Sequence, residues 1–292
     1  MRSHTDVEED EVMPVNRRRA LGLWLGLALL TLSGPPTTFA QTAAAPAARC
    51  EADNEYQEGA ILWTQTAGEA RALTYQAFAL ARVVLDRDLR ATRRGGKRRA
   101  VVVDADETVL DNSRFQARLL KDCQGYSPQR WSEWVGREEA EAIPGAVEFL
   151  RYAASRGVRV FYVTNRKESE KAATASNLKK LGFPGVSDAT LLVRPEAGSS
   201  SKEPRRRAVA AKYRIVLLVG DNLNDFAEVF EQSRTVADRL AAVEQNRAQF
   251  GARFIVLPNV MYGDWESAVY GYDPKLTDEQ KAARRKSLLR TY

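Results

Sequence analysis

Two aspartates that are one residue apart, Asp104 and Asp106, follow directly after an apolar run in the sequence. The three valines at 101–103 indicate a buried parallel strand, and open α/β sheets bind their ligands beyond the carboxyl ends of such strands. Carboxylates at that position can hold a hard cation, transfer a proton or act as nucleophiles. An Asp-x-Asp pair alone fits an exposed turn equally well, so the rest of the chain must decide.

Polar residues also follow two later apolar runs. Residues 158–164 read Val-Arg-Val-Phe-Tyr-Val-Thr and end at Thr164. Residues 215–219 lead directly into Gly-Asp-Asn-Leu-Asn-Asp, which contains Asp221 and Asp225. Because the carboxyl ends of parallel strands share one edge of a sheet, these side chains and the first aspartate pair are expected to converge.

The converging residues supply acids, a hydroxyl and an amine, which suit phosphate chemistry. Lys202 stands 19 residues before Asp221, and its ammonium, like the Thr164 hydroxyl, could bind phosphate oxygens. Carboxylates can hold Mg²⁺, which prefers oxygen ligands and keeps waters for substrate phosphate. An aspartate can attack phosphorus to form an aspartyl phosphate, while the cation and the lysine keep that nucleophile ionised.

The order of the predicted elements defines the frame that must position these residues. Strand and helix patterns alternate over residues 99–275, which predicts an α/β core with a doubly wound, mostly parallel sheet flanked by helices. Residues 54–98 carry a helical period and are expected to pack on this core. Residues 112–142 are predicted to form a small helical cap, and residues 276–292 a helical tail.

The first residues have the pattern of an export signal. Three arginines at 17–19 precede a 14-residue apolar run at 20–33, and small residues follow it. This order predicts a signal peptide over 1–40, then a linker over 41–53, and hence a secreted or periplasmic protein. The run is shorter than the about 20 residues of a membrane span, so no stable span is expected after cleavage. An uncleaved anchor and the twin-arginine export route stay open.

The composition excludes several classes of function. The single histidine, His4, precedes the predicted cleavage site, so the mature chain has no Ser-His-Asp triad, phosphohistidine or His-ligated zinc. Cys50 and Cys123 could form a disulfide or remain as two thiols, and the arginine before Cys50 argues against lipid attachment there. The net charge of +6 suits small anionic ligands. The basic clusters of the chain lack interleaved aromatic residues, so no nucleic-acid polymer is expected as a partner.

The ordered motifs resemble those of the haloacid dehalogenase-like phosphatases, and more closely the class C (lipoprotein e-type) acid phosphatases and 5'-nucleotidases. The matching stretches are 104–113, 163–166, 220–226 and 261–266, with Lys202 between the second and the third. The resemblance covers roughly residues 55–275. It implies a Rossmannoid core and an Mg²⁺-dependent phosphomonoesterase for small organic phosphates, nucleoside 5'-monophosphates included. Ala105 departs from the family, which has a bulkier apolar residue there, and the family's lipid-attachment cysteine has no counterpart.

The resemblance implies different roles for the four aspartates. Asp104 would be the nucleophile and would also ligate Mg²⁺. Asp106 would protonate the leaving alkoxide and then activate water, while its backbone carbonyl ligates the metal. Asp221 would be the third protein ligand, and Asp225 would hold a metal-bound water or a neighbouring group.

The resemblance also implies which residues would contact the substrate. Thr164, Asn165 and Lys202 would bind the phosphate, and Tyr262 would stack on a nucleobase or aryl group. Phe115 is a second candidate for that pocket. Each has a simpler interpretation, since a threonine can cap a helix, a lysine can be solvated and an aromatic side chain can belong to the core.

Two other functions stay open at the level of sequence. A phosphotransferase would pass the phosphoryl group from Asp104 to an alcohol or nucleoside instead of water. A non-catalytic protein on the same scaffold would bind nucleotides or haem without turnover. A homodimer is also possible, because the sequence does not determine the oligomeric state.

Overall fold

The computed structural model describes residues 52–91 and 96–292. The predicted signal peptide and Cys50 lie outside these residues, while Cys123 is disulfide-bonded. Among the described helices, none combines the length and the apolar character needed to cross a membrane.

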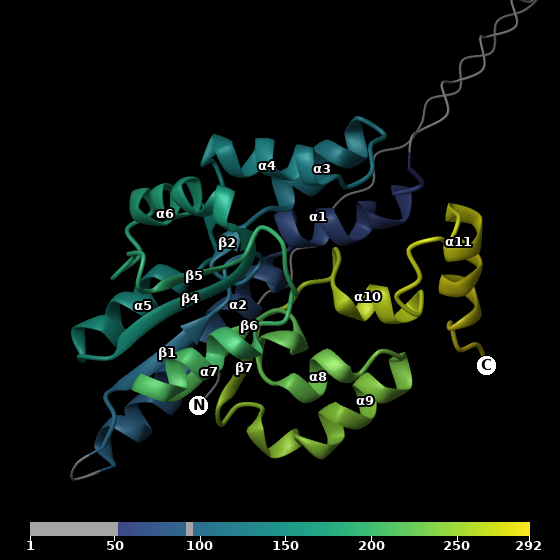
Figure 1. Cartoon of the computed structure of the whole chain (residues 1–292). Helices are drawn as coiled ribbons and strands as arrows, with labels where there is room; N and C mark the ends of the chain where they lie inside the picture. Colours follow the sequence, from purple (N-terminus) through teal and green to yellow (C-terminus); the bar gives the residue numbers. More distant parts are fainter. Residues whose placement is uncertain (1–51, 92–95) are drawn as a thin grey trace, which may run out of the picture. The chain divides into compact units, whose positions relative to one another are not determined.

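Five parallel strands form the central sheet in the order β5-β4-β1-β6-β7 (Figure 1). They are β1 Arg99–Val103, β4 Arg159–Lys167, β5 Leu191–Arg194, β6 Arg214–Gly220 and β7 Phe254–Val256. The first strand in the chain is therefore the middle strand of the sheet. The prediction of a mostly parallel α/β sheet flanked by helices is confirmed.

Both faces of the sheet are apolar because helices cover both. On one face, Val101 and Val103 join a core with residues of helices α2 Gly68–Arg90, α5 Ala146–Ser155 and α6 Lys171–Lys180. On the other face, Val102 joins a second core. Its helices are α7 Glu203–Lys212, α8 Glu228–Gln232 and α9 Val236–Gln245. Alternate valines of one strand thus face opposite cores, as the pleat requires.

Two helices precede the sheet. Ala67 has extended backbone and separates α1 Glu58–Thr66 from α2. The face of α2 that packs on the sheet contains small residues such as Ala77 and Ala81, which allow a close approach. Other apolar residues of the helical period lie on the outer side of α2. Leu73, for example, is 41 % exposed.

The insertion after β1 contains two helices, α3 Ser113–Lys121 and α4 Pro128–Arg137. The chain enters and leaves it through an antiparallel pair of two-residue strands, β2 Leu110–Asp111 and β3 Glu141–Ala142. Ser127 is the N-cap of α4, because its hydroxyl accepts a hydrogen bond from the Arg130 N–H at 3.2 Å.

The remaining elements are short. Helices α10 Asp264–Val269 and α11 Asp278–Ser287 follow the sheet. Single 3₁₀ turns lie at η1 Glu55–Gln57, η2 Glu168–Glu170, η3 Leu223–Asp225 and η4 Arg247–Gln249. Gly182 follows α6 with a φ of +81°, a conformation that glycine adopts without strain and that ends the helix.

Candidate active site

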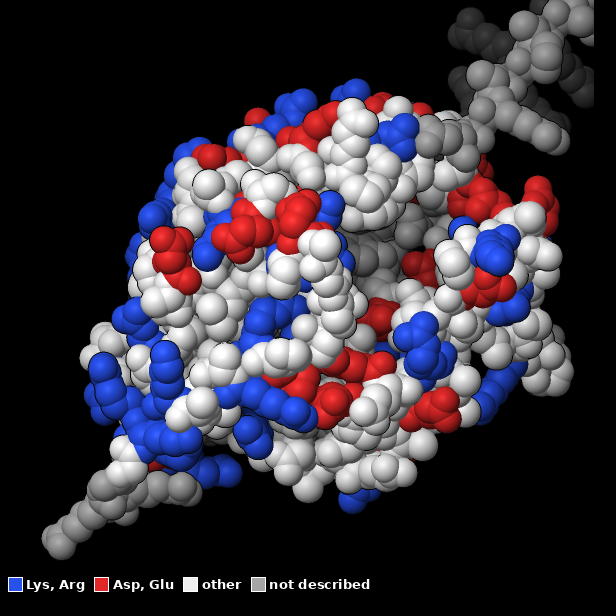
Figure 2. Space-filling model, viewed as in Figure 1, with Lys and Arg blue, Asp and Glu red and all other residues white. Residues whose placement is uncertain are grey.

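A cleft of about 1000 Å³ lies where the carboxyl ends of β1, β4 and β6 meet. Its lining includes all four motif aspartates, and its far end is formed by residues of η1, α10 and α11. Figure 2 shows this hollowed face, in which acidic side chains gather with basic ones beside them. The volume is at the upper end of the usual range for small-molecule sites, about 300–1,000 Å³.

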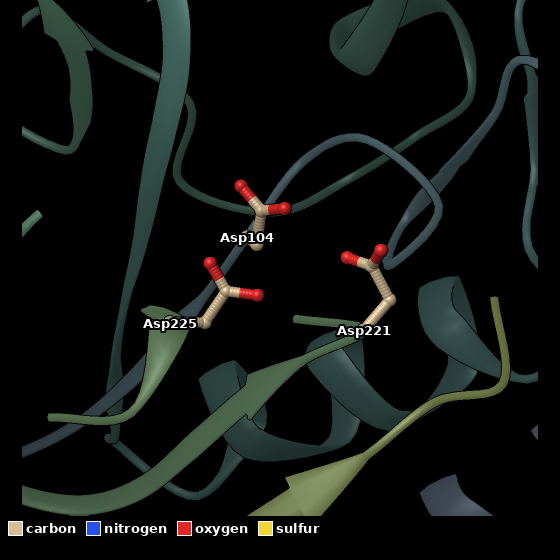
Figure 3. A group of neighbouring side chains, drawn as sticks. All are labelled: Asp104, Asp221 and Asp225. Carbon is tan, nitrogen blue, oxygen red and sulfur yellow. The ribbon is translucent and has the colours of Figure 1, made fainter. Parts of the chain in front are cut away.

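Three carboxylates meet in this cleft. Asp104 follows β1, while Asp221 and Asp225 follow β6, and each offers an oxygen within 4.8 Å of the others. In Figure 3 the three carboxylates face a common space. Residues more than one hundred positions apart come together because β1 and β6 are neighbouring parallel strands. Sequence reasoning predicted this convergence from the strand ends alone.

The turn after β6 is built around Asp225. The Asp225 Oδ2 atom accepts a hydrogen bond from the Asn222 N–H at 3.0 Å, which caps the η3 turn. The Asp225 carboxylate also lies against Gly220, where a Cβ atom would stand 2.3 Å from Asp225 Oδ2. Glycine is therefore required at position 220 for this carboxylate to reach the cleft. The capping role and the site role of Asp225 coexist, since the two oxygens have different partners.

Lys202 places its ammonium between two of the three carboxylates. Its Nζ atom donates to Asp104 Oδ1 at 2.5 Å and to Asp225 Oδ1 at 2.6 Å, and the side chain is only 8 % exposed. Lys202 is therefore not a solvated surface base. The two carboxylates raise the pKa of Lys202 in spite of its burial, so the ammonium stays charged.

The three carboxylates carry more negative charge than Lys202 neutralises. Burial raises the pKa of Asp104 well above its usual value, and the neighbouring acids raise it further. Burial and the charge on Asp225 also raise the pKa of Asp221, to about 7. A divalent cation among these oxygens would relieve this repulsion, and an all-oxygen donor set suits a hard cation such as Mg²⁺. The residues present thus fit such an ion.

Two residues that sequence reasoning did not single out orient Asp221. The Thr108 hydroxyl donates to Asp221 Oδ1 at 3.1 Å, and the Asn259 side-chain amide donates to Oδ2 at 2.8 Å. Both lie in loops beyond strand ends, after β1 and β7. Nothing in their spacing relative to Asp221 indicated the contact.

The Asp106 carboxylate is held apart from the other three. Arg166, at the end of β4, donates to Asp106 Oδ1 from Nη2 at 2.7 Å and from Nε at 3.0 Å. The Asn112 amide adds a third bond to Oδ1 at 3.0 Å. Sequence reasoning missed Arg166, although a charged residue two positions after Thr164 on a buried strand has to find a buried partner.

The predicted phosphate-binding residues of β4 differ in their exposure. Thr164 is fully buried, its hydroxyl accepts from the Arg166 N–H at 3.1 Å, and it lies 3.4 Å from Asp106 Oδ2. Asn165 is exposed and lines the cleft. Its Oδ1 accepts from Arg205 Nη2 at 2.6 Å, so its amide NH₂ remains available for an anion.

The two predicted pocket aromatics lie in different surroundings. Tyr262 lines the cleft, and its hydroxyl bonds to the buried Glu107 carboxylate. Phe115 is only 4 % exposed and contacts Trp131 edge to face, with ring centroids 5.2 Å apart. Phe115 therefore belongs to the core under the cap, and its prediction as a pocket residue is wrong. Gln116 and Leu119 are the residues of α3 that line the cleft, whereas Phe115 packs in the core.

A family model, the HAD superfamily, subfamily IIIB (acid phosphatase), matches residues 36–265 of the chain. The match covers well over half of the sequence, so the chain belongs to this family. The fold and the family together define the class of enzyme as a phosphomonoesterase.

The chain is also similar to solved structures and to curated relatives. The class C acid phosphatase from Bacillus anthracis has 42% identity and a TM-score of 0.76, over 81% of this chain and 98% of that chain. Its structure with tungstate bound gives a TM-score of 0.75 at the same identity. Acid phosphatase 1 of Solanum lycopersicum is 26% identical over 42% of this chain and 50% of its own length. A stem 31 kDa glycoprotein of Glycine max is 28% identical over 41% of this chain and 49% of its own length, so the chain spans about half of these curated relatives.

Proposed function

We propose that this chain is an exported, Mg²⁺-dependent acid phosphatase that hydrolyses small phosphomonoesters through an aspartyl phosphate on Asp104. The observation that carries the proposal is the convergence of three carboxylates and one buried ammonium in a single cleft, with oxygens within 4.8 Å. Membership of an acid phosphatase family and the likeness to a structure with tungstate, a tetrahedral oxyanion, support it.

Each residue of the cluster has a distinct task in this proposal. Asp104, Asp221 and Asp225 would hold Mg²⁺, which when bound neutralises the cluster and the negative charge of the phosphoryl group. Lys202 would bind a phosphate oxygen with the ammonium that already contacts Asp104. Asn165 offers its amide NH₂ to the same group from the end of β4.

The reaction takes place in two displacements at phosphorus. In the first, an Asp104 oxygen forms a bond to phosphorus, the bond to the leaving oxygen breaks, and Asp106 gives its proton to that oxygen. In the second, Asp106 takes a proton from water as the water oxygen attacks phosphorus. The bond between phosphorus and Asp104 then breaks and releases inorganic phosphate.

The far end of the cleft supports a substrate with a sizeable organic group. Tyr262 lines the cleft, and so do Tyr56 and Tyr270. Aromatic walls suit nucleosides and aryl groups, because every nucleobase has a π face for stacking. We therefore include nucleoside 5'-monophosphates among the substrates.

The proposal is tested by replacing the nucleophile. Asp104→Asn is expected to lower p-nitrophenyl phosphate turnover by about 10³-fold or more, since an amide cannot form the phosphoenzyme. The measurement is made at several pH values with added Mg²⁺, and a chelator should abolish wild-type turnover. Asp188→Asn, whose side chain is 100% exposed, is the matched control and should keep full activity. Retained turnover in folded Asp104→Asn would disprove the assignment.

A further inference from the structure

Arg166 is buried and touches no metal-site carboxylate, yet it makes the strongest contacts of Asp106. Its side chain is 1% exposed, although β4 carries it to the edge of the sheet next to the cleft. Two of its nitrogens, Nη2 and Nε, contact the same oxygen, Asp106 Oδ1, at 2.7 and 3.0 Å. A guanidinium offers a planar fork, so this pair fixes the orientation of the carboxyl group.

The guanidinium is itself held in place on its other sides. Nη1 donates to the Thr174 hydroxyl at 3.2 Å, and Nη2 also donates to Asn112 Oδ1 at 3.3 Å. The Trp131 ring of the cap lies 5.4 Å from the guanidinium carbon. Asn112 is held in turn by the Trp134 indole N–H at 2.8 Å. The support of Asp106 therefore extends through Arg166 and Asn112 into the cap.

The two oxygens of Asp106 are not equivalent. Oδ1 accepts three bonds of 2.7 to 3.0 Å, from Arg166 and Asn112. Oδ2 has longer contacts, 3.3 Å to Arg166 Nε and 3.4 Å to the Thr164 hydroxyl. Oδ2 is thus the oxygen that can exchange a proton without breaking the anchoring bonds.

We propose that Arg166 is the positioning residue of the general acid. It holds Asp106 by Oδ1 so that Oδ2 delivers its proton to the leaving oxygen as the bond between that oxygen and phosphorus breaks. The inference rests on the proposed function, because it presupposes that Asp106 protonates a leaving group. A purely structural ion pair between β4 and the turn after β1 is the competing interpretation.

The two interpretations differ in their dependence on the leaving group. An alkoxide needs the proton, whereas p-nitrophenoxide leaves readily without it. We therefore compare kcat/KM, which reports phosphorylation of Asp104, for a nucleoside 5'-monophosphate and for p-nitrophenyl phosphate with Mg²⁺ present. Arg166→Gln should lower kcat/KM for the nucleotide by about 10²-fold and kcat/KM for p-nitrophenyl phosphate by less than about tenfold. Arg166→Lys keeps the charge without the fork and should give a smaller loss with the same selectivity.

A double variant and a control complete the test. Because Arg166 acts through Asp106, adding Arg166→Lys to the Asp106→Asn variant should lower kcat/KM by less than about a further threefold. Arg214→Lys weakens a different ion pair at the opposite end of the sheet, so it should lower the melting temperature and leave the substrate ratio unchanged. Equal losses on both substrates, or additive losses in the double variant, would overturn the positioning role. A wild-type protein that turns over neither substrate would instead refute the proposed function.

Discussion

Tyr262 has two contacts that single substitutions can separate. Its hydroxyl bonds to Glu107, whose carboxylate is buried, while its ring lines the cleft. Tyr262→Phe keeps the ring, so KM for a nucleoside 5'-monophosphate should change by less than about threefold. The same variant leaves a buried carboxylate oxygen without a partner and should lower the free energy of unfolding by about 1–3 kcal/mol.

Tyr262→Ala is the companion variant. If the ring stacks on the base, KM for the nucleotide should rise by about tenfold, since one stacking contact contributes about 1–3 kcal/mol. A small alkyl phosphate has nothing to stack and should keep its KM. A KM that rises equally for both substrates would mean that Tyr262 acts only through the turn at Glu107.

The site residues differ in how far the sequence could predict them. Asp104 and Asp221 could be placed together, because a parallel sheet brings its strand ends to one edge. Arg166 and Asn259 could not, because their contacts depend on side-chain rotamers and loop paths that have no periodic pattern. Phe115 was misjudged for a related reason, since an aromatic residue near a site has the same sequence signal whether it faces the cleft or the core.

At the scale of elements, Asp88 in the last turn of α2 ties the helix to the sheet. Its carboxylate bonds to Arg99, the first residue of β1, and to Arg214, the first residue of β6, at 2.6 Å each. The hydrogen bond from Arg214 is the main reason that the pKa of Asp88 falls to about 2. The folded state therefore favours the ionised form, and this stabilisation is present above the ordinary pKa near 4 and lost as the pH falls through about 2.

Asp88→Asn is expected to lower the free energy of unfolding by about 1–2 kcal/mol at pH 7. The difference from wild type should shrink between about pH 4 and pH 2, as measured by denaturant unfolding at each pH, while kcat stays unchanged. Asp122→Asn breaks an exposed i, i+4 pair with Arg118 and is the matched control, with little expected effect. A pH-independent difference for Asp88→Asn would mean that the ionic contacts contribute nothing.

At the scale of the whole molecule, the proposed Mg²⁺ site would couple stability to the cation. The metal-free protein has to keep three acids close together, two of them buried, so Mg²⁺ should raise its free energy of unfolding. The gain would be about 2.7 kcal/mol at 100 times the dissociation constant, seen as a rise in melting temperature of several degrees. Asp221→Asn should lose most of this rise, and potassium chloride at equal ionic strength should not reproduce it. Equal melting temperatures with Mg²⁺ and with chelator would contradict the metal site.

The sheet was the part of the molecule that the sequence predicted best. Runs such as Val101 to Val103 and Leu217 to Val219 are apolar throughout because helices cover both faces, and that pattern differs from a half-exposed strand. The separation of α1 from α2 at Ala67 was harder to predict, since the helical period of the sequence continues across Ala67.

The middle position of β1 has a consequence for biogenesis. Val101 pairs with Val160 on one side and with Leu217 on the other, so both neighbours of β1 are made after it. At about 5–20 residues per second, the first strand of the sheet waits on the order of 10 s for its second partner. Both edges of this apolar strand are unpaired until β4 is made, and one edge stays unpaired until β6 is made. The yield of active protein should therefore depend on chain concentration and chaperones during folding, even where the finished enzyme is stable.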